Sequence, residues 1–466
     1  MPAGGTWQSQ NKVRPGAYIN VVGVPKPLSS IGERGIVAIV MEPGWGEKIT
    51  RLSVNEFLTG SGLYKIGANY TDNTDVARQL RLVFQGAATA VIRRSNTSQV
   101  KAAATIASGT CTATAKYAGT FGNNISLKVT LNTTTVDEET TLDSVTVETY
   151  VGGVLKAKMT SADKDAFSNE WVDINATALS SFVGGEYTLS GGSNGSADEM
   201  TNIFADLEQE NWNVLAFPAT ESVSKDAAVS FIKSMRDDNG IKVQAVLTEC
   251  SGQNSSGYIF TPYAPDYEGV YVCKQGYRLS DGTVISPIDE VYMIAGLVAG
   301  ATITQSLTGT VIQNAIEVLH NPKTNEGFVD AINGGKLVLS KRRKDGAIVI
   351  EYDVNSFTSL TAKKGKVFTK GRPVRVLDNI CNDVKGLWDG TYLGKVSNNE
   401  DGRGLFKADI IKYMNDLQKM EAVQNFDPDA DVEVIAGDEP DGVVANLWVQ
   451  PVDSMEKLYM TIPVWG

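Results

Sequence analysis

The stretch GIVAIVM at residues 35–41 determines the fold class more than any other part of the chain. It is short, apolar and rich in β-branched side chains, as strands buried on both faces of a parallel sheet are. Residues 73–86 then predict an amphipathic helix capped by Thr74, and residues 89–93 (TAVIR) predict a second strand. The side chains expected on the apolar face of that helix are Val76, Leu80, Val83 and Phe84.

The same alternation of strand and helix signals resumes about a hundred residues later along the chain. Such alternation indicates a mainly parallel sheet with helices on both faces, so we predict one α/β domain built from two separated halves. The predicted elements of the second half are a helix opened by a capping box from Ser196 to Glu199 and running through residue 208, a strand at residues 213–217, a helix at residues 225–238 that stops at Gly240, and a strand at residues 241–248.

Residues 96–194 interrupt the pattern with a segment rich in Thr, Ser and Gly that has little helical periodicity. Residues 126–130 and 145–150 predict strands, and Gly122-Asn123-Asn124 and Gly152-Gly153 indicate turns. The simplest interpretation is a small β-sandwich or barrel inserted into the α/β domain. Its polar composition is suited to a solvated, outer position.

The last third of the chain has the character of an α+β domain. Residues 404–423 predict its clearest helix, and strands are predicted at residues 432–436, 443–449 and 457–464. The expected apolar stripe of the helix is Phe406, Ile410, Met414, Leu417 and Met420.

Both ends of the chain predict single strands joined to the body by polar or Pro-bounded segments. A lone strand cannot satisfy its own backbone hydrogen bonds, so each must add to a sheet, either of the same chain or of a neighbour. At the C-terminal end only a short turn separates this strand from the one before. The residues expected to pair are Ala17, Tyr18, Ile19, Asn20, Val21 and Val22 at one end and Leu458, Tyr459, Met460, Thr461 and Ile462 at the other.

The predicted fold class is therefore α/β plus an all-β insertion plus an α+β C-terminal domain, a multidomain protein with extended N- and C-terminal β-strand arms. The predicted parts are an N-terminal arm at 1–25, a discontinuous α/β domain at 26–95 and 196–350, the inserted β-sandwich or barrel at 96–195, the C-terminal α+β domain at 351–455, and a C-terminal arm strand at 456–466.

Composition excludes several classes of function. The 466 residues carry a net charge of −12, which argues against binding nucleic acid through its phosphates. The four cysteines have no metal-like spacing, and we expect reduced thiols in a protein made and kept inside the cell. The polar first residues do not form a signal peptide, and the most apolar stretch, residues 291–303, is too short to span a bilayer.

Catalytic and metal sites are not predicted. His320 is the single histidine and is expected at a helix C-terminus. No nucleophile elbow or phosphate-binding loop occurs. Residues 427–433 begin like a calcium loop, but Val432 and Asp438 stand where Gly and Glu are needed, so we interpret them as an acidic turn. We expect no enzyme and no cofactor.

A set of weak motifs, in order along nearly the whole chain, resembles the contractile phage tail sheath family. The likeness is closest to sheaths of phages, defective phages and tail-like bacteriocins of Gram-positive bacteria. The motifs are Pro15 to Ile19, Ala295 to Gly300 followed by Gln305 to Thr308, Glu351 to Thr358, Arg372 to Asp378, Tyr392 to Val396, Gly402-Arg403, and Pro451 to Tyr459.

The resemblance implies a structural subunit that polymerises as stacked hexameric rings around a tail tube and contracts to drive the tube through an envelope. The terminal arms would pair with sheets of neighbouring subunits. The implied partners are other copies of the chain, the tube protein, and baseplate and tail terminator proteins, with no nucleic acid and no membrane contact. The implied location is a virion tail or tail-like particle assembled in the host bacterial cytoplasm. The helix at residues 405–423 would face the tube with Lys407, Lys412, Asp416 and Lys419.

Two other classes of protein remain as alternatives. One is an α/β hydrolase-like enzyme with an inserted β domain, which the single histidine disfavours. The other is a different phage structural protein, such as a capsid or baseplate component.

Overall fold

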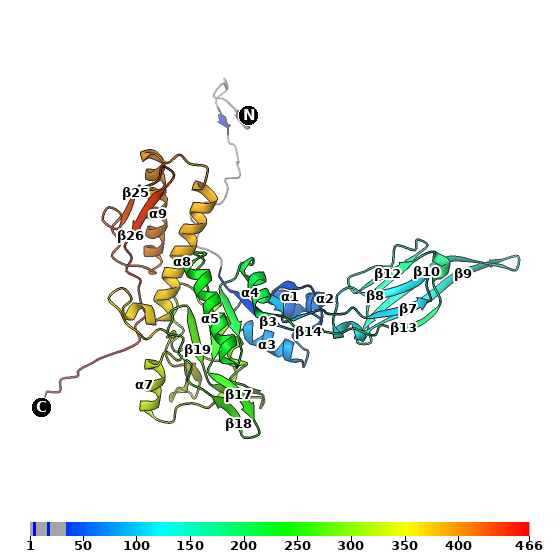
Figure 1. The fold of residues 1–466 in the computed structure, drawn as a ribbon, viewed down its shortest axis with the longest axis horizontal. Coiled ribbons are helices and arrows are strands. Elements are labelled where there is room, and N and C mark those ends of the chain that lie inside the picture. The colour runs from blue at the N-terminus through cyan, green and yellow to red at the C-terminus, as the bar shows by residue number, and fades with distance from the viewer. Residues whose placement is uncertain (1–2, 6–15, 19–33, 466) are drawn as a thin grey trace.

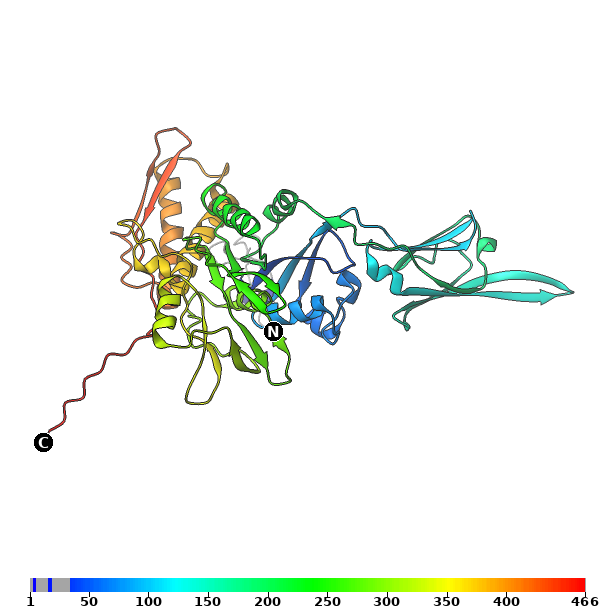
Figure 2. The ribbon, with the colours of Figure 1, turned by 60° about the horizontal axis from the view of Figure 1, so that its bottom comes forward.

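The computed structural model describes residues 3–5, 16–18 and 34–465. It is a mixed α/β, multidomain protein, elongated along one axis (Figures 1 and 2). A β-rich part lies at one end of that axis, a central α/β part in the middle and a helical C-terminal part at the other end. The residue boundaries predicted for these parts stay predictions.

The central part is built on a six-stranded sheet in the order β19-β16-β15-β3-β5-β4, parallel except for β4 at one edge. Helices α3 and α6 cover one face and helices α4 and α5 the other, as the alternation predicted. The strands are β3 (Ile36–Met41), β4 (Ile49–Ser53), β5 (Thr89–Arg94), β15 (Val214–Phe217), β16 (Gln244–Thr248) and β19 (Val270–Cys273), and the helices α3 (Asp75–Val83), α4 (Met200–Glu208), α5 (Ser222–Asp237) and α6 (Glu290–Gly300).

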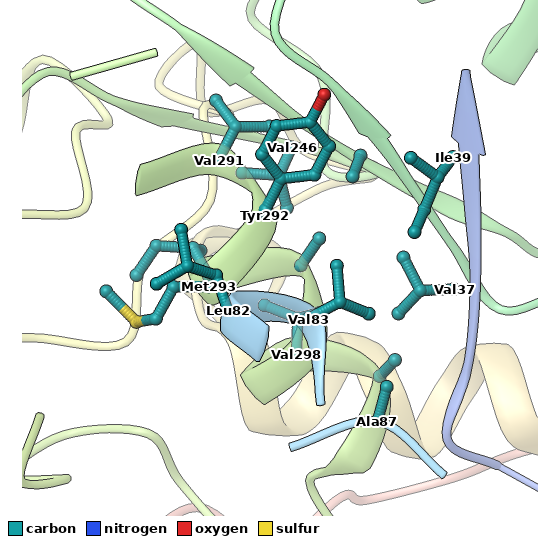
Figure 3. Close-up of a cluster of buried hydrophobic side chains, with 14 of the residues drawn as sticks. Val37, Ile39, Leu82, Val83, Ala87, Val246, Val291, Tyr292, Met293 and Val298 are labelled. Atoms are coloured by element: carbon teal, nitrogen blue, oxygen red, sulfur yellow. The ribbon is translucent and has the colours of Figure 1, made fainter. Parts of the chain in front are cut away.

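The core between the sheet and α6 is closely packed because α6 lacks side chains where it crosses α3. A Cβ on Gly296 would collide with the carbonyl oxygen of Val83. Figure 3 shows Val83 beside Val298 of α6, with Val37 and Ile39 of β3 facing the same cluster. Thr74 caps α3 as predicted, since its side chain accepts a hydrogen bond from the backbone N–H of Ala77 at 3.2 Å.

The inserted part consists of two small sheets, β11-β10-β9-β13 and β12-β8-β7, around one apolar cluster. Trp45, from a loop of the central part, is fully buried in that cluster, 5.3 Å from the ring of Tyr117 and 6.0 Å from that of Trp171. The two parts therefore share a core at their junction. The strands are β7 (Ala103–Ala107), β8 (Cys111–Ala115), β9 (Ile125–Val136), β10 (Glu139–Val151), β11 (Val154–Ser161), β12 (Val172–Ala176) and β13 (Gly185–Thr188).

The C-terminal part packs helices α8 and α9 with a two-stranded hairpin, β25–β26, around a separate apolar cluster. A π-helical turn, Trp388–Tyr392, follows α8. The bounds are α8 (Gly371–Leu387), α9 (Glu400–Lys419), β25 (Val432–Ala436) and β26 (Val443–Leu447).

Smaller elements complete the described chain. They are β1 (Ala3–Gly5), β2 (Gly16–Tyr18), β6 (Asn96–Thr97), β14 (Ser196–Ala197), β17 (Cys250–Asn254), β18 (Gly257–Phe260), β20 (Gly276–Leu279), β21 (Val284–Ile285), β22 (Ala315–Leu319), β23 (Leu339–Lys341) and β24 (Ile348–Ile350), the α-helices α1 (Val54–Thr59), α2 (Leu63–Ile66) and α7 (Asn325–Asn333), and the 3-10 helices Thr120–Asn124, Leu179–Ser181 and Lys366–Thr369.

Two predictions about helix ends were wrong because the residues concerned pair as strands with distant segments. Ser196 pairs with Thr97 as a strand, so the helix after it begins only at Met200 and has no side-chain cap. His320 does not end a helix, since the residues before it form strand β22 against β20. His320 itself has a left-handed φ of 55°.

The long C-terminal helix also differs from its prediction. It begins at Glu400, where Asn399 caps it, and ends at Lys419. Met420 therefore lies beyond the helix and is exposed, while the other four residues of the predicted stripe are buried. Strand β26 ends at Leu447, and residues 457–464 form no strand in the single chain.

Candidate subunit interfaces

The C-terminal tail is an extended segment without a partner in its own chain. Residues 457–465 have no assigned helix or strand and pair with no strand that the structure describes. Leu458 is 83% exposed and its neighbour Tyr459 is 90% exposed, so neither side of the segment is covered. The predicted pairing residues Met460, Thr461 and Ile462 are likewise exposed. Pairing of this segment within the described part of the subunit does not occur.

The tail leaves the body from a fixed point. The carboxylate of Glu456 forms an ion pair with Lys370 and accepts a hydrogen bond from Ser306 Oγ at 2.7 Å. Arg372 donates to Ser454 Oγ at 2.8 Å, two residues earlier in the chain. Lys370 and Arg372 stand at the start of α8, so the helix holds the base of the tail while the residues after it extend freely. The sequence did not predict a role for either Lys370 or Arg372.

Acidification is expected to release the base of the tail. Burial alone would raise the pKa of Glu456, but hydrogen bonds from Lys370 and Ser306 hold that pKa below its ordinary value of about 4.5. A depressed carboxylate pKa stabilises the contact above the unfolded-state pKa, and this stabilisation is lost as pH falls through the folded pKa. Amide hydrogen exchange near residues 453–456 should therefore accelerate, relative to exchange in the core, once the pH falls below the ordinary pKa of a glutamate.

A matched variant tests whether the carboxylate of Glu456 holds the base of the tail. Glu456→Gln should show fast exchange at the tail base already at neutral pH and little further change on acidification. The same fast exchange in the wild-type protein at pH 7 would contradict the clamp.

The hairpin β25–β26 has unpaired edges. Its two strands pair only with each other, and no third strand of the described chain joins them. One face packs on α9 through Val432 and Leu447, whereas Ile435, Val444 and Trp448 remain exposed. An isolated two-stranded sheet is of marginal stability, and free edges accept strands from other chains. The hairpin is therefore suited to strand addition.

The N-terminal arm is described only in part. Ala17 and Tyr18 belong to β2, which pairs in parallel with β1. The other predicted pairing residues, Ile19, Asn20, Val21 and Val22, lie outside the described residues. Strand addition by this arm stays a prediction.

Helix α9 carries the four side chains expected to face a tube. Lys412 and Lys419 are exposed, and Lys407 and Asp416 are half-buried. Lys419 pairs with Asp416 at 3.0 Å, one turn away on the same helix. The helix thus presents a charged surface opposite its apolar stripe, but a contact with a tube stays a prediction.

A buried network of charges, absent from the sequence predictions, joins α8 to the central part. Arg375 and Asp353 are both fully buried and pair at 2.9 Å. Burial alone would lower the pKa of Arg375, but the facing carboxylate of Asp353 raises it. Arg236 of α5 makes a second, bidentate pair with Asp378, at 2.7 and 2.8 Å. Charged residues spaced among apolar ones in residues 372–378 were the only signal of this in the sequence.

Other chemistry is sparse in the described part of the chain. It holds no group of three or more His, Cys, Asp or Glu side chains arranged to bind a metal ion. Residues 427–431 form a turn closed by aspartate oxygens that accept backbone N–H groups. All four cysteines are free thiols, and none of the helices described has the length and apolar character needed to cross a membrane.

An unpaired tail and a hairpin with open edges are features suited to association with other chains by strand addition. Comparison with known proteins identifies the family. Residues 194–356 match the family model of the phage tail sheath protein central domain, and residues 363–464 match that of the phage tail sheath C-terminal domain. The chain belongs to the contractile phage tail sheath family.

Individual relatives extend over nearly the whole chain. It is 31% identical to the phage-like element PBSX protein XkdK of Bacillus subtilis, over 99% of both chains. Among solved structures, the sheath tail protein of Desulfitobacterium hafniense is 33% identical with a TM-score of 0.73, over 96% of this chain and 99% of that one. The sheath tail protein Lin1278 of Listeria innocua is 28% identical with a TM-score of 0.78, over 92% and 95%.

Proposed function

We propose that this chain is the subunit of a contractile tail sheath that polymerises as stacked hexameric rings around a tail tube and contracts to drive that tube through a target envelope. The single observation that carries the proposal is the exposed apolar tail, anchored at Glu456 and unpaired beyond it. Main-chain pairing with a neighbour would cover it, and the edges of β25–β26 are one open ladder that the described chain offers. The N-terminal arm would make a similar connection.

The elongated shape supports an assignment of the parts. The inserted β part and the C-terminal part lie at opposite ends of the long axis (Figure 1). We place the inserted part, residues 96–195, on the outside of the sheath and the C-terminal part, residues 351–455, against the tube. In this arrangement Lys407, Lys412, Asp416 and Lys419 contact the tube through exchangeable, charge-based contacts that contraction can break.

During contraction the body of each subunit and its arms would have different roles. Trp45 ties the inserted part to the centre, and the pair between Arg236 of α5 and Asp378 ties α8 to it. Each subunit would therefore move as one body while the arms keep their ladders and the linkers beside them change direction. The subunit needs no cofactor and catalyses no reaction, binds neither nucleic acid nor membrane, and assembles in the bacterial cytoplasm with tube, baseplate and terminator proteins.

Electron microscopy of the protein expressed alone, and then with its tube protein, tests the proposal. Hollow tubes with a helical repeat are expected, and deletion of residues 1–24 should leave dispersed particles. Closed shells would instead favour a capsid or baseplate component. No assembly even with the tube protein present would refute the sheath function.

A further inference from the structure

A groove of about 530 Å³ lies at the turn end of the β25–β26 hairpin. Its floor is a cluster of three aromatic rings, Trp388, Tyr392 and Phe406, with centroids 4.8 to 6.2 Å apart. Its rim includes Leu393, which is 57% exposed, and the lining reaches Val443, the first residue of β26. An apolar, aromatic hollow of this kind is suited to a large side chain.

Arg403 adds a cation to this groove. Its guanidinium donates to Asn398 Oδ1 at 2.8 Å, and no carboxylate of the described residues forms an ion pair with it. A guanidinium without a carboxylate partner can stack on the face of an aromatic ring, best of all on an indole. The aromatic floor and Arg403 therefore suit an aromatic occupant, and Asp441, which also lines the groove, disfavours an anionic one.

The chain itself carries a matching side chain. Trp465 lies in the unpaired tail and is 96% exposed. In both views the tail runs away from β25 and β26, so it does not cover the groove of its own subunit (Figures 1 and 2). The occupant would then be the tail of a second copy, which is also the source of the added strand in the proposed function.

The lengths of the segments agree with this placement. Residues 458–462 number five, as do the residues of β25 and of β26. Pro463 has no N–H and ends any ladder there. At about 3.3 Å per residue, Trp465 would stand about 10 Å beyond the last paired residue. The groove lies beyond the turn end of the hairpin, so the tail would run antiparallel to β26 or parallel to β25.

We propose that Trp465 of one subunit inserts into the groove lined by Trp388, Tyr392, Phe406 and Arg403 of a neighbouring subunit. This inference rests on the proposed sheath function and adds a specific anchor to it. The added strand supplies the main-chain ladder, and the tryptophan fixes its register, because a slip of one residue would turn the indole to the opposite face.

Disulfide trapping provides the direct test. In a background of Cys381→Ser, which removes the exposed native thiol, one chain carries Trp465→Cys and another carries Ser397→Cys on the groove lining. Mild oxidation of co-assembled tubes should give covalent dimers only in the mixture of the two chains. A chain that carries both substitutions and closes a disulfide as an unassembled monomer would show docking within one subunit and overturn the proposal.

Assembly thresholds provide a second test. Trp465→Ala should raise the critical concentration for tube formation about tenfold or more, as loss of a tryptophan hot spot does. Val464→Ala, the matched control on the opposite side of the strand, should change it by less than about threefold. Ser397→Trp, which fills the groove from an exposed position and leaves the tail intact, should act like Trp465→Ala.

Different outcomes would overturn the tryptophan anchor and the sheath function. Wild-type tubes with no mixed disulfide, and with Trp465→Ala behaving like Val464→Ala, would overturn the anchor and leave the sheath function standing. If the wild-type chain forms no tubes even with its tube protein, both the sheath function and the anchor are overturned.

Discussion

Removal of residues 457–466 should abolish tube formation while leaving the subunit folded. The deleted segment makes no described contact with the body beyond its first residue, so the thermal unfolding midpoint should change little. Each main-chain hydrogen bond contributes about 0.5–1.5 kcal/mol, so a five-residue ladder with its apolar side chains amounts to several kcal/mol. Since 1.4 kcal/mol is a tenfold change, the critical concentration should rise at least about 100-fold. Sedimentation of the variant across a concentration series measures the effect.

A matched pair of substitutions separates the ladder from the side chains. Met460→Pro removes one backbone N–H in the middle of the segment and should reproduce most of the deletion. Met460→Ala keeps the backbone and should assemble at a concentration within about tenfold of the wild type. Tubes formed by the truncated chain at wild-type concentrations would show that this arm does not connect subunits.

Asp353→Ala should be the most damaging single substitution within the body. It leaves the guanidinium of Arg375 fully buried with only the Tyr271 hydroxyl and the Gln305 carbonyl oxygen as partners. Breaking a buried ion pair from one side typically costs about 3–5 kcal/mol, because a charge stays behind without its counter-charge. The midpoint of urea unfolding should fall accordingly.

Two further variants serve as controls for Asp353→Ala. Lys385→Ala removes an exposed ion pair at 3.1 Å with Asp389 of the π-helical turn after α8 and should cost less than about 1 kcal/mol. Replacing both buried partners, as Asp353→Leu with Arg375→Met, should be less destabilising than Asp353→Ala alone. An Asp353→Ala protein as stable as the Lys385→Ala control would show that the buried Arg375–Asp353 pair does not stabilise the subunit.

Hydrophobic periodicity predicted the helices and strands whose apolar side chains face a buried core. Residues 36–41 form a central strand in which five of the six side chains are buried, whichever face they occupy. The helix around Leu80 was predicted from its single apolar face. In the inserted part only the strands at residues 126–130 and 145–150 were predicted, and the corresponding β9 and β10 run longer than those apolar stretches. Ser196 and residues 315–319 were misassigned because each has local helix signals that pairing with a distant strand overrides.

The candidate interfaces likewise include some features that a local sequence pattern predicts and others that only tertiary contacts create. The sequence predicted the C-terminal segment that has no partner in the described part of its own chain, since alternation is a local feature. It did not predict the clamp on Glu456, the Arg375–Asp353 pair or the aromatic groove, because each brings together residues that are distant in the chain.

By itself, then, the sequence determined the mixed α/β, multidomain class of the fold and the presence of an extended C-terminal arm, both of which depend on hydrophobic periods of two or 3.6 residues. Only the tertiary structure decided where the C-terminal arm is anchored, which edges are open to receive a strand, and how charged side chains such as Arg375 could be buried. Those outcomes depend on the distances between residues remote in sequence, and the free energy of a buried charge depends on a partner that no local pattern specifies.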